Sequence, residues 1–522
     1  MNNTPTLTGR PAKTDATGPP DHKPGSSTIF QLQYLRALAA VSVVLCHASF
    51  YVREYRGDGR MWPIFGRGGN FGVVLFFAIS GYLMARLAQN APGTLFMTHR
   101  LIRIYPIYWL CILGVVAINL LFGSTVRPNP LALLLIPGGT TSYVLGVEWT
   151  LPFELTFYFL VFLIIILRFQ RFIPFIAAIW VLAIEVVYAL KPEFQEGQFP
   201  HFLHLPLSQY SLPFAAGLLV PFAIKRNCVG PATLIIAIGT LLASESMSRL
   251  SLSFGLTSLG CALLVAVAAR PREAGSSRPN RTLAALGDWS YALYLCHVPI
   301  IVALCKQMPP TIPSMQVWFA AVGLPLIAAI VVGKIDLAVY RQLKKWVDRS
   351  NKWITGTLCI VFLVILFFVG LRPYVFNILN RKTFATADSI AKQILSLNNT
   401  KHLSLATAAQ SIGFRPDPEL LSYSDGLYDK GGIRINARGW AADVIGRDRG
   451  ITILLFFCGH YLGCVIPREK RPDVASVLRT GNDRYGFNES FPIPGGCDSG
   501  AIEELIVTED NCYKIMSGDI QR

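Results

Sequence analysis

Residues 32–51 read LQYLRALAAVSVVLCHASFY, a run that is almost wholly apolar and yet contains one arginine, Arg36, and one histidine, His47. A run of this length can cross about 30 Å of hydrocarbon as an α-helix. Similar runs recur as far as residue 371, and no soluble core requires that repetition. The segment therefore predicts the fold class, an all-α polytopic membrane bundle.

The composition supports a chain built for lipid. It is 52% hydrophobic and only 15% charged, with a mean hydropathy of +0.45. The formal net charge of +16 could indicate nucleic acid, but basic residues in short loops also fix membrane orientation. Because the charges stand at the ends of the apolar runs, we expect the lipid bilayer as a partner and no nucleic acid.

The apolar runs and the polar residues between them predict about ten core spans plus one extra. The predicted spans are 31–52, 70–88, 104–122, 149–168, 172–190, 205–223, 231–247, 252–269, 289–306, 316–338 and 353–371. With a cytoplasmic N-terminus, most basic clusters fall in inner loops, as orientation requires. The loop after the first span is an exception, because it would place Arg53, Arg56, Arg60 and Arg67 outside. Either function holds that loop outside or the parity is wrong.

Four regions are predicted. Residues 1–30 form a disordered cytoplasmic tail without a signal peptide, and 31–345 form the membrane domain. Residues 346–379 add a transmembrane helix and a linker, which places 380–522 outside the cytoplasm. That last region contains short alternating stretches such as Ile451 to Phe457 and is predicted to be a small β-rich domain. Its four cysteines, at positions 458, 464, 497 and 512, permit disulfides or are buried thiols.

The first span should mark the working site, because ionisable groups inside a membrane need a partner, a cavity or a function. Arg36 and His47 are eleven positions apart. On a helix they share one face and are separated by roughly 16 Å along the axis. His47 is either a general base or a structural histidine bonded to another helix.

Other spans contain further candidates. Arg100 and Arg103 stand at a predicted helix start, where two guanidinium groups and the helix N-terminus suit phosphates; ordinary positive-inside anchoring gives the same residues. Glu154 is expected near the depth of His47, where it would orient the imidazole or serve as a structural ion-pair partner. The ninth span offers Tyr291, Tyr294 and His297, the last two one turn apart, which either line the same cavity or are packed structurally. No metal site is predicted.

Together these segments resemble the membrane-bound acyltransferase 3 family, bacterial enzymes that acylate envelope and secreted glycans. The matching segments are Arg36 with His47, Phe76-Phe77-Ala78-Ile79-Ser80-Gly81-Tyr82, Arg100 with Arg103, Trp149-Thr150-Leu151 with Glu154, and Ser290-Tyr291 through His297. The resemblance implies a catalytic role for His47 and an acyl-CoA site at Arg100 and Arg103. From its expected depth, Glu154 would be the catalytic partner of His47, and Arg36 would join the acyl-CoA site. Cavity-lining candidates are Ser80, Tyr82, Trp149, Tyr294 and His297.

The chain departs from the family at two places. Lys334-Ile335-Asp336-Leu337 stands where an acidic-basic-proline motif is common, so no role is carried over to Asp336. No Gly-Asp-Ser hydrolase signature follows residue 380. The region resembles instead a small β-sandwich appended to some glycan-modifying enzymes, through Gly439-Trp440-Ala441, Arg471-Pro472-Asp473-Val474-Ala475 and Gly486-Phe487.

The resemblance implies an O-acyltransferase of the bacterial inner membrane. Its donor would be cytoplasmic acyl-CoA, with acetyl expected, used as a co-substrate with no bound cofactor. Its acceptor would be a glycan or a lipid-linked saccharide. A proton-coupled transporter or glycan exporter is the rival from another class, since buried His, Arg and Glu also relay protons. A sensor anchored by its membrane part is a weaker rival, because anchoring needs only one span.

Overall fold

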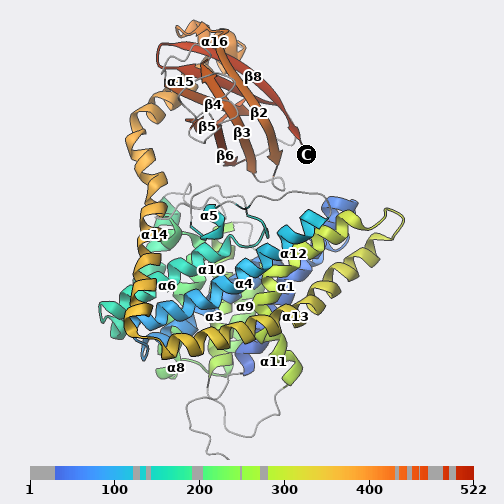
Figure 1. Cartoon of the computed structure of the whole chain (residues 1–522), viewed down its shortest axis with the longest axis vertical. Helices are drawn as coiled ribbons and strands as arrows, with labels where there is room; N and C mark the ends of the chain where they lie inside the picture. Colours follow the sequence, from blue (N-terminus) through green and yellow to red (C-terminus); the bar gives the residue numbers. More distant parts are fainter. Residues whose placement is uncertain are drawn as a thin grey trace, which may run out of the picture.

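The computed structural model describes residues 30–121, 128, 130–136, 143–190, 204–246, 250–270, 280–401, 403–429, 434–443, 450–457, 459–467, 486–492 and 501–521. The first part of the chain is a helical bundle, and the last part is a β-sheet with two helices packed on it (Figure 1). The helix α14 leads from the bundle towards the sheet. This confirms the outline of the predicted fold class. The predicted tail lies outside the described residues except for its last residue, Phe30.

Each predicted span coincides with a helix. These helices are α1 (Phe30–Arg56), α3 (Gly68–Ala88), α4 (Gly93–Leu121), α6 (Thr150–Ile166), α7 (Ile173–Leu190), α8 (Leu212–Lys225), α9 (Pro231–Ser246), α10 (Leu250–Ala269), α12 (Ser290–Gln307), α13 (Ser314–Arg349) and α14 (Lys352–Leu379). Shorter pieces are α2 (Trp62–Phe65), α5 (Pro130–Leu133), η1 (Gln170–Phe172), η3 (Leu205–Leu207), η4 (Gln209–Ser211) and α11 (Arg281–Asp288).

Seven helical segments among the described residues are long and apolar enough to cross a membrane. The helices α6 and α9 and residues Trp353–Phe368 of α14 are apolar but shorter. The protein is thus a multi-pass membrane protein by the length and composition of its helices. The count of about eleven spans, and the side on which each terminus lies, stay predictions.

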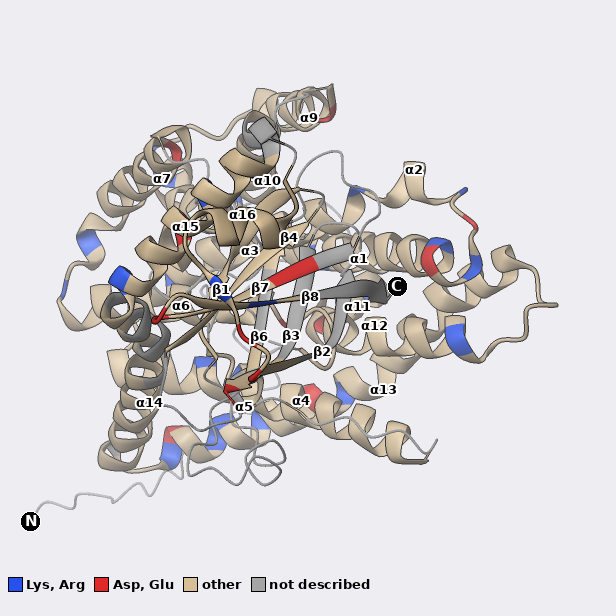
Figure 2. Cartoon of the chain, turned by 90° about the horizontal axis from the view of Figure 1, so that it is seen from above, with Lys and Arg blue, Asp and Glu red and all other residues tan. Residues whose placement is uncertain are grey.

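The outer face of the bundle is apolar, as lipid requires. On α7, Phe175, Ile179 and Leu182 are 66%, 68% and 63% exposed. Water would penalise so much exposed apolar surface, whereas hydrocarbon does not. Figure 2 shows few charged residues along the helices of the bundle. The charged groups that do lie inside the bundle therefore need a separate explanation.

The helices α3 and α8 cross at two glycines. A Cβ atom added at Gly81 would lie 2.1 Å from the carbonyl oxygen of Phe214, and one at Gly217 would lie 2.2 Å from that of Ala78. Small residues at a crossing let two helix backbones approach closely in a membrane. Gly81 directly follows Ser80, so this contact also sets the position of that hydroxyl group.

The helix α4 begins at Gly93, eleven residues before the predicted start of its span at 104. The intervening polar residues remain helical because neighbouring helices bind them. Thr98 contacts the carbonyl of Thr355 at 3.5 Å, and a ring nitrogen of His99 lies 2.8 Å from Asp348. The helix therefore begins earlier than predicted, and Arg100 lies well inside α4 rather than at its N-terminus.

The arginines that conflicted with the positive-inside pattern have partners in the structure. Arg56 donates hydrogen bonds to the carbonyls of Met308, Pro309 and Ile312, at 2.8, 3.0 and 2.6 Å. Arg60 pairs with Asp58, and its hydrogen bonds lower the pKa of that carboxyl group. Arg67 pairs with Glu245, and Arg53 lies over the Trp62 ring. These contacts hold the four arginines where they lie, from the end of α1 to the residue before α3.

The C-terminal region begins with α15 (Arg381–Lys401) and α16 (Leu405–Ser411). Its strands are β1 (Arg415–Pro416), β2 (Leu420–Asp429), β3 (Arg434–Asp443), β4 (Ile451–Phe457), β5 (His460–Val465), β6 (Gly486–Pro492), β7 (Ala501–Thr508) and β8 (Cys512–Gln521). The strand order is β5-β4-β7-β8-β2-β3-β6, with β1 beside β8. The pairs β1–β8 and β2–β8 are parallel, and the others are antiparallel.

Strand β4 is buried on both faces. Leu454 and Phe456 pack in one cluster with residues of α15 and α16, whereas Ile453, Leu455 and Phe457 pack in another. Residues of β2, β3 and β6 share that second cluster: Leu420, Ala441 and Phe487. The sheet thus encloses a core between its two halves, in keeping with the expected sandwich, and α15 and α16 cover its outer face.

Two of the segments that carried the sandwich resemblance are neighbours. Gly439 pairs with Phe487, and Trp440 pairs with Gly486, between β3 and β6. The third segment, 471–475, lies outside the described residues, as do Cys458 and Cys497. The two described cysteines of this region, Cys464 and Cys512, are free thiols.

Candidate active site

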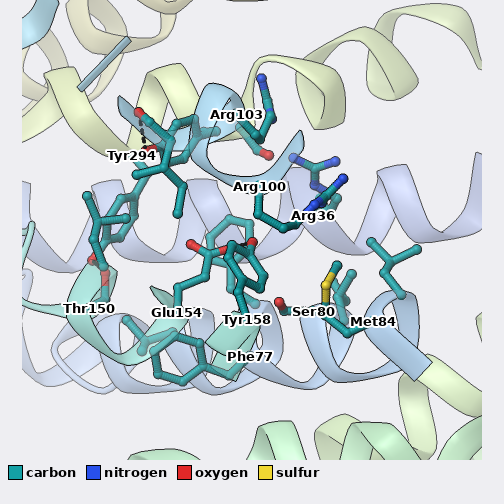
Figure 3. A pocket seen from close by; sticks show the side chains of 18 residues that line it. Arg36, Phe77, Ser80, Met84, Arg100, Arg103, Thr150, Glu154, Tyr158 and Tyr294 are labelled. Atoms are coloured by element: carbon teal, nitrogen blue, oxygen red, sulfur yellow. Dashed lines mark hydrogen bonds between the residues drawn. The ribbon is translucent and has the colours of Figure 1, made fainter. Parts of the chain in front are cut away.

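A cavity of about 150 Å³ lies inside the bundle (Figure 3). It is lined from α1, α3, α4, α6 and α12, by Arg36, Val73, Phe76, Phe77, Ile79, Ser80, Leu83, Met84, Arg100, Arg103, Ile104, Thr150, Leu151, Glu154, Tyr158, Ser290, Tyr291 and Tyr294. Of the predicted site residues, the structure brings Arg36, Ser80, Arg100, Arg103, Glu154 and Tyr294 together here.

The cavity has a cationic end. Figure 3 shows Arg36, Arg100 and Arg103 gathered on one side, and Thr150 with Tyr294 on the other. Glu154 is the only carboxylate among the lining residues. The lining therefore has an excess of positive charge, in a region where a buried charge is costly unless it is paired.

Arg103 is paired outside the cavity lining. One of its terminal nitrogens lies 2.8 Å from each carboxylate oxygen of Asp336 on α13. Its guanidinium group also lies over the rings of Tyr291 and Tyr340, at 5.2 and 5.4 Å from their centroids. Asp336 is only 3% exposed. This ion pair fixes Arg103 and offsets its charge.

The charges of Arg36 and Arg100 are less neutralised than that of Arg103. Among the described residues, no carboxylate oxygen lies within 4.0 Å of either guanidinium group. Arg36 contacts Gln33 at 3.4 Å, and Arg100 lies over the Tyr158 ring at 5.8 Å. The buried Nε of Arg100 and hydroxyl of Ser290 have no hydrogen-bond partner in the described part of the chain. These groups are available to an anionic ligand.

Glu154 accepts a hydrogen bond from the hydroxyl group of Tyr158, one turn further along α6. Both side chains line the cavity with the arginines. The predicted pairing of Glu154 with His47 is therefore not the one that the structure shows. The depth assigned from sequence placed Glu154 too close to the histidine, whereas the structure places it with Arg36.

His47 pairs with another histidine. Its Nδ1 lies 3.1 Å from Nε2 of His297, and the two ring centroids are 5.0 Å apart. His297 is fully buried, and His47 is half-buried. Neither residue is among those lining the cavity, so the histidine pair and the cationic end are two separate places in the bundle.

Tyr294 connects these two places. Its hydroxyl group contacts Thr150 at 2.9 Å and the carbonyl oxygen of Val147 at 2.8 Å, within the cavity wall. Its ring lies 5.9 Å from that of His297, one turn along α12. Tyr294 therefore joins the cavity lining to the histidine pair.

Besides His297, two more of the cavity-lining candidates lie elsewhere. Tyr82 is buried on α3 and accepts a hydrogen bond at its hydroxyl group from Arg86, at 3.2 Å. Trp149 packs its ring against Tyr210 and Phe153, with centroids 5.0 and 6.2 Å away. Neither residue is among those that line the cavity.

Sequence reasoning missed Asp336, Tyr158 and Ser290 as site residues. Each of them gave a weak signal. Asp336 is an acidic residue in an apolar helix, and Tyr158 follows Glu154 by one helical turn. Ser290 is the first residue of the segment that ends at His297. Buried carboxylates in a membrane are rarely incidental, so Asp336 could have been assigned to one of the arginines.

The fold and the site define a polytopic membrane protein with a cationic cavity inside the bundle and a histidine pair that contacts one of its lining residues. A family model described as an acyltransferase domain matches residues 29–334, more than half of the chain. The chain therefore belongs to the acyltransferase 3 family, whose members transfer acyl groups other than amino-acyl groups. Neither the curated proteins nor the solved structures gave a match.

Proposed function

We propose that this protein is an O-acyltransferase that moves a short acyl group, in the first instance acetyl, from cytoplasmic acyl-CoA to a hydroxyl group of an envelope or secreted glycan. Membership of an acyltransferase family favours this function over a transporter. The observation that carries the proposal is the cationic cavity, whose lining residue Tyr294 packs against His297 of the histidine pair.

The donor would bind by its phosphates at the cationic end. Arg36 and Arg100 have no ion-pair partner among the described residues, and guanidinium groups bind phosphate oxygens in a bidentate manner. Arg103, held by Asp336, would supply a third, fixed charge. The uncharged arm of the donor would then extend along the cavity and bring the thioester towards Tyr294.

His47 would perform the proton transfer. It takes the proton of the acceptor hydroxyl group as that oxygen attacks the acyl carbon, the C–S bond breaks, and the proton passes to the departing thiolate. In a second route, His47 attacks first and holds the acyl group as an acyl-imidazole before the acceptor takes it. Either route needs one ring nitrogen with a free lone pair.

We place the acceptor on the extracytoplasmic side of a bacterial inner membrane, together with the C-terminal region. The N-terminus would lie in the cytoplasm, next to the donor. Lipid-linked and secreted saccharides are both reachable from that side. The separation of the cationic end from the histidine pair supports such a division between an inner donor and an outer acceptor.

The acyl transfer itself is tested in cells. Mass spectrometry of envelope and secreted glycans should show an acyl increment in cells that express the protein, and no increment with His47→Ala. His460→Ala, an exposed histidine on β5, is the matched control and should keep the increment. Equal acylation in the His47→Ala cells, at equal protein level in the membrane, would refute the proposal.

The donor site is tested with purified protein in nanodiscs. Arg100→Gln should weaken acetyl-CoA binding by about tenfold or more. A hydrogen bond to a charged group contributes about 1.5–3 kcal/mol, and about 1.4 kcal/mol corresponds to tenfold in affinity. Arg226→Gln changes an arginine that lies over Phe222 outside the cavity and should bind normally. If both variants bind acetyl-CoA like the unmodified protein, Arg100 is not part of the donor site.

A further inference from the structure

The hydrogen bonds of the histidine pair determine where its protons lie. Nδ1 of His297 lies 3.1 Å from the carbonyl oxygen of Leu293 and 2.8 Å from that of Tyr294. A carbonyl oxygen only accepts hydrogen bonds. Nδ1 of His297 must therefore carry the proton. In the neutral ring, Nε2 is then an acceptor with a free lone pair.

The same argument applies to His47. Its Nδ1 lies 3.0 Å from the carbonyl oxygen of Val43 and 3.1 Å from Nε2 of His297. Both neighbours are acceptors, so Nδ1 of His47 must be the donor. The remaining nitrogen of His47, Nε2, then has no proton and presents its lone pair.

We infer that His297 is a positioning residue that holds His47 in the tautomer with its proton on Nδ1, so that Nε2 is the nitrogen that meets the acceptor hydroxyl group. This inference rests on the proposed function, which needs His47 as the base or nucleophile. It assigns to a neutral imidazole the orienting role that sequence reasoning gave to Glu154.

The proton transfer balances on this arrangement. The O–H bond of the acceptor breaks and an N–H bond forms at Nε2 of His47. The resulting imidazolium keeps its Nδ1 proton, which stays hydrogen-bonded to Nε2 of His297 and to the Val43 carbonyl. These two acceptors stabilise the transient positive charge, and the proton leaves Nε2 when the donor thiolate takes it.

The surroundings favour a neutral partner. The rings packed nearest the pair are Tyr51, stacked on His47 at 6.2 Å, and Tyr294, 5.9 Å from His297. Glu154, the carboxylate of the cavity lining, accepts a hydrogen bond from Tyr158 and not from His47. Because His297 is fully buried, an imidazole can orient His47 there without the cost of a permanent charge.

Two amide substitutions separate the two nitrogens of His297. The amide oxygen of His297→Gln reaches the place of Nε2 and can still accept from His47. The amide of His297→Asn reaches only the place of Nδ1, so it keeps the backbone contact and loses the acceptor. Both variants are neutral, polar and similar in size, so their effects on insertion should match.

The measurements are single-turnover acyl transfer and acetyl-CoA affinity in nanodiscs. We expect His297→Gln to transfer within a few-fold of the unmodified rate, and His297→Asn to be slower by about 100-fold or more, the lower range for general base catalysis. Donor affinity should be unchanged in both, because His297 is not among the residues that line the cavity.

The inference is overturned if both variants transfer at the normal rate, or if both lose transfer equally while binding the donor normally. Failure of the proposed function gives a different pattern. In that case the His47→Ala variant would transfer as fast as the unmodified protein, or the unmodified protein would not transfer acetyl to a glycan.

Discussion

The crossing of α3 and α8 gives the sharpest test of how packing positions the site. In Gly81→Ala, the new Cβ would lie 2.1 Å from the carbonyl oxygen of Phe214, whereas real Cβ contacts shorter than 3.0 Å are essentially never seen. The two helices must therefore separate by about 1 Å. Overpacking of this kind costs about 1–3 kcal/mol, so the melting temperature in detergent should fall. Ser80 would move with the backbone, and a misplacement of about 1 Å can slow catalysis by about 10²-fold.

A second glycine provides the control. A Cβ at Gly114 on α4 would meet nothing within 4 Å, so Gly114→Ala should raise helix stability by about 1 kcal/mol and leave acyl transfer unchanged. Gly217→Ala, on the other side of the α3–α8 crossing, should behave like Gly81→Ala. If Gly81→Ala melts and transfers acyl groups like Gly114→Ala, close packing at this crossing does not position the site.

Four further outcomes are expected. Asp336→Asn should lower thermal stability by about 3–5 kcal/mol, because it leaves Arg103 buried without its carboxylate; adding Arg103→Gln should cost less than the two losses summed, and additive losses would argue against the pair. Arg56→Gln should lower the melting temperature, since charge-assisted hydrogen bonds contribute about 1.5–3 kcal/mol each; an unchanged value would contradict that. His460→Cys should react with a membrane-impermeant maleimide applied from the extracytoplasmic side, and protection from the reagent would place the region in the cytoplasm. Acetyl phosphate should be a much poorer donor than acetyl-CoA in a transfer assay, and equal rates would show that the length of the donor is irrelevant.

The helices of the bundle could be predicted because each is apolar over most of its surface. A run such as 173–190 contacts lipid on one side and other helices on the other, and both surroundings are apolar. Hydropathy alone therefore predicts this helix. Hydropathy failed at the start of α4, where Thr98, His99 and Arg103 interrupt the apolar run. Their partners, Thr355, Asp348 and Asp336, are 233 or more residues away, and no local pattern indicates such distant contacts.

The site was predicted as a set of residues but not as an arrangement. Helical phase places Arg36 and His47 on one face of the first helix, and that argument needs no knowledge of how the helices pack. The partner of His47 depends on how α1 and α12 pack, and Glu154 was assigned to it by counting turns from an assumed membrane surface. Helix tilt makes such counting inaccurate, and Glu154 lies instead with Arg36 in the cavity.

The C-terminal region shows a similar limit. The sequence predicts residues 451–457 to be a strand from alternation between flanking turn residues. They are buried on both faces, and so the helices that cover one face could not be inferred from alternation. The order of strands in the sheet is also a long-range property, since β4 pairs with β7 and β3 pairs with β6.

The separation of the two parts of the site constrains the donor. Arg36 and His47 are roughly 16 Å apart along one helix. A small anion with its acyl group beside its charge would bind at the arginines with the reactive carbon far from His47. A donor with a charged head and a long uncharged arm can occupy both places at once, because the lining between the arginines and Tyr294 is largely apolar and aromatic. The same separation keeps the arginines, which a nearby imidazolium would repel, away from the proton transfer. Under the proposed function, the distance between anion binding and proton transfer is therefore a requirement of the chemistry as well as a feature of the fold.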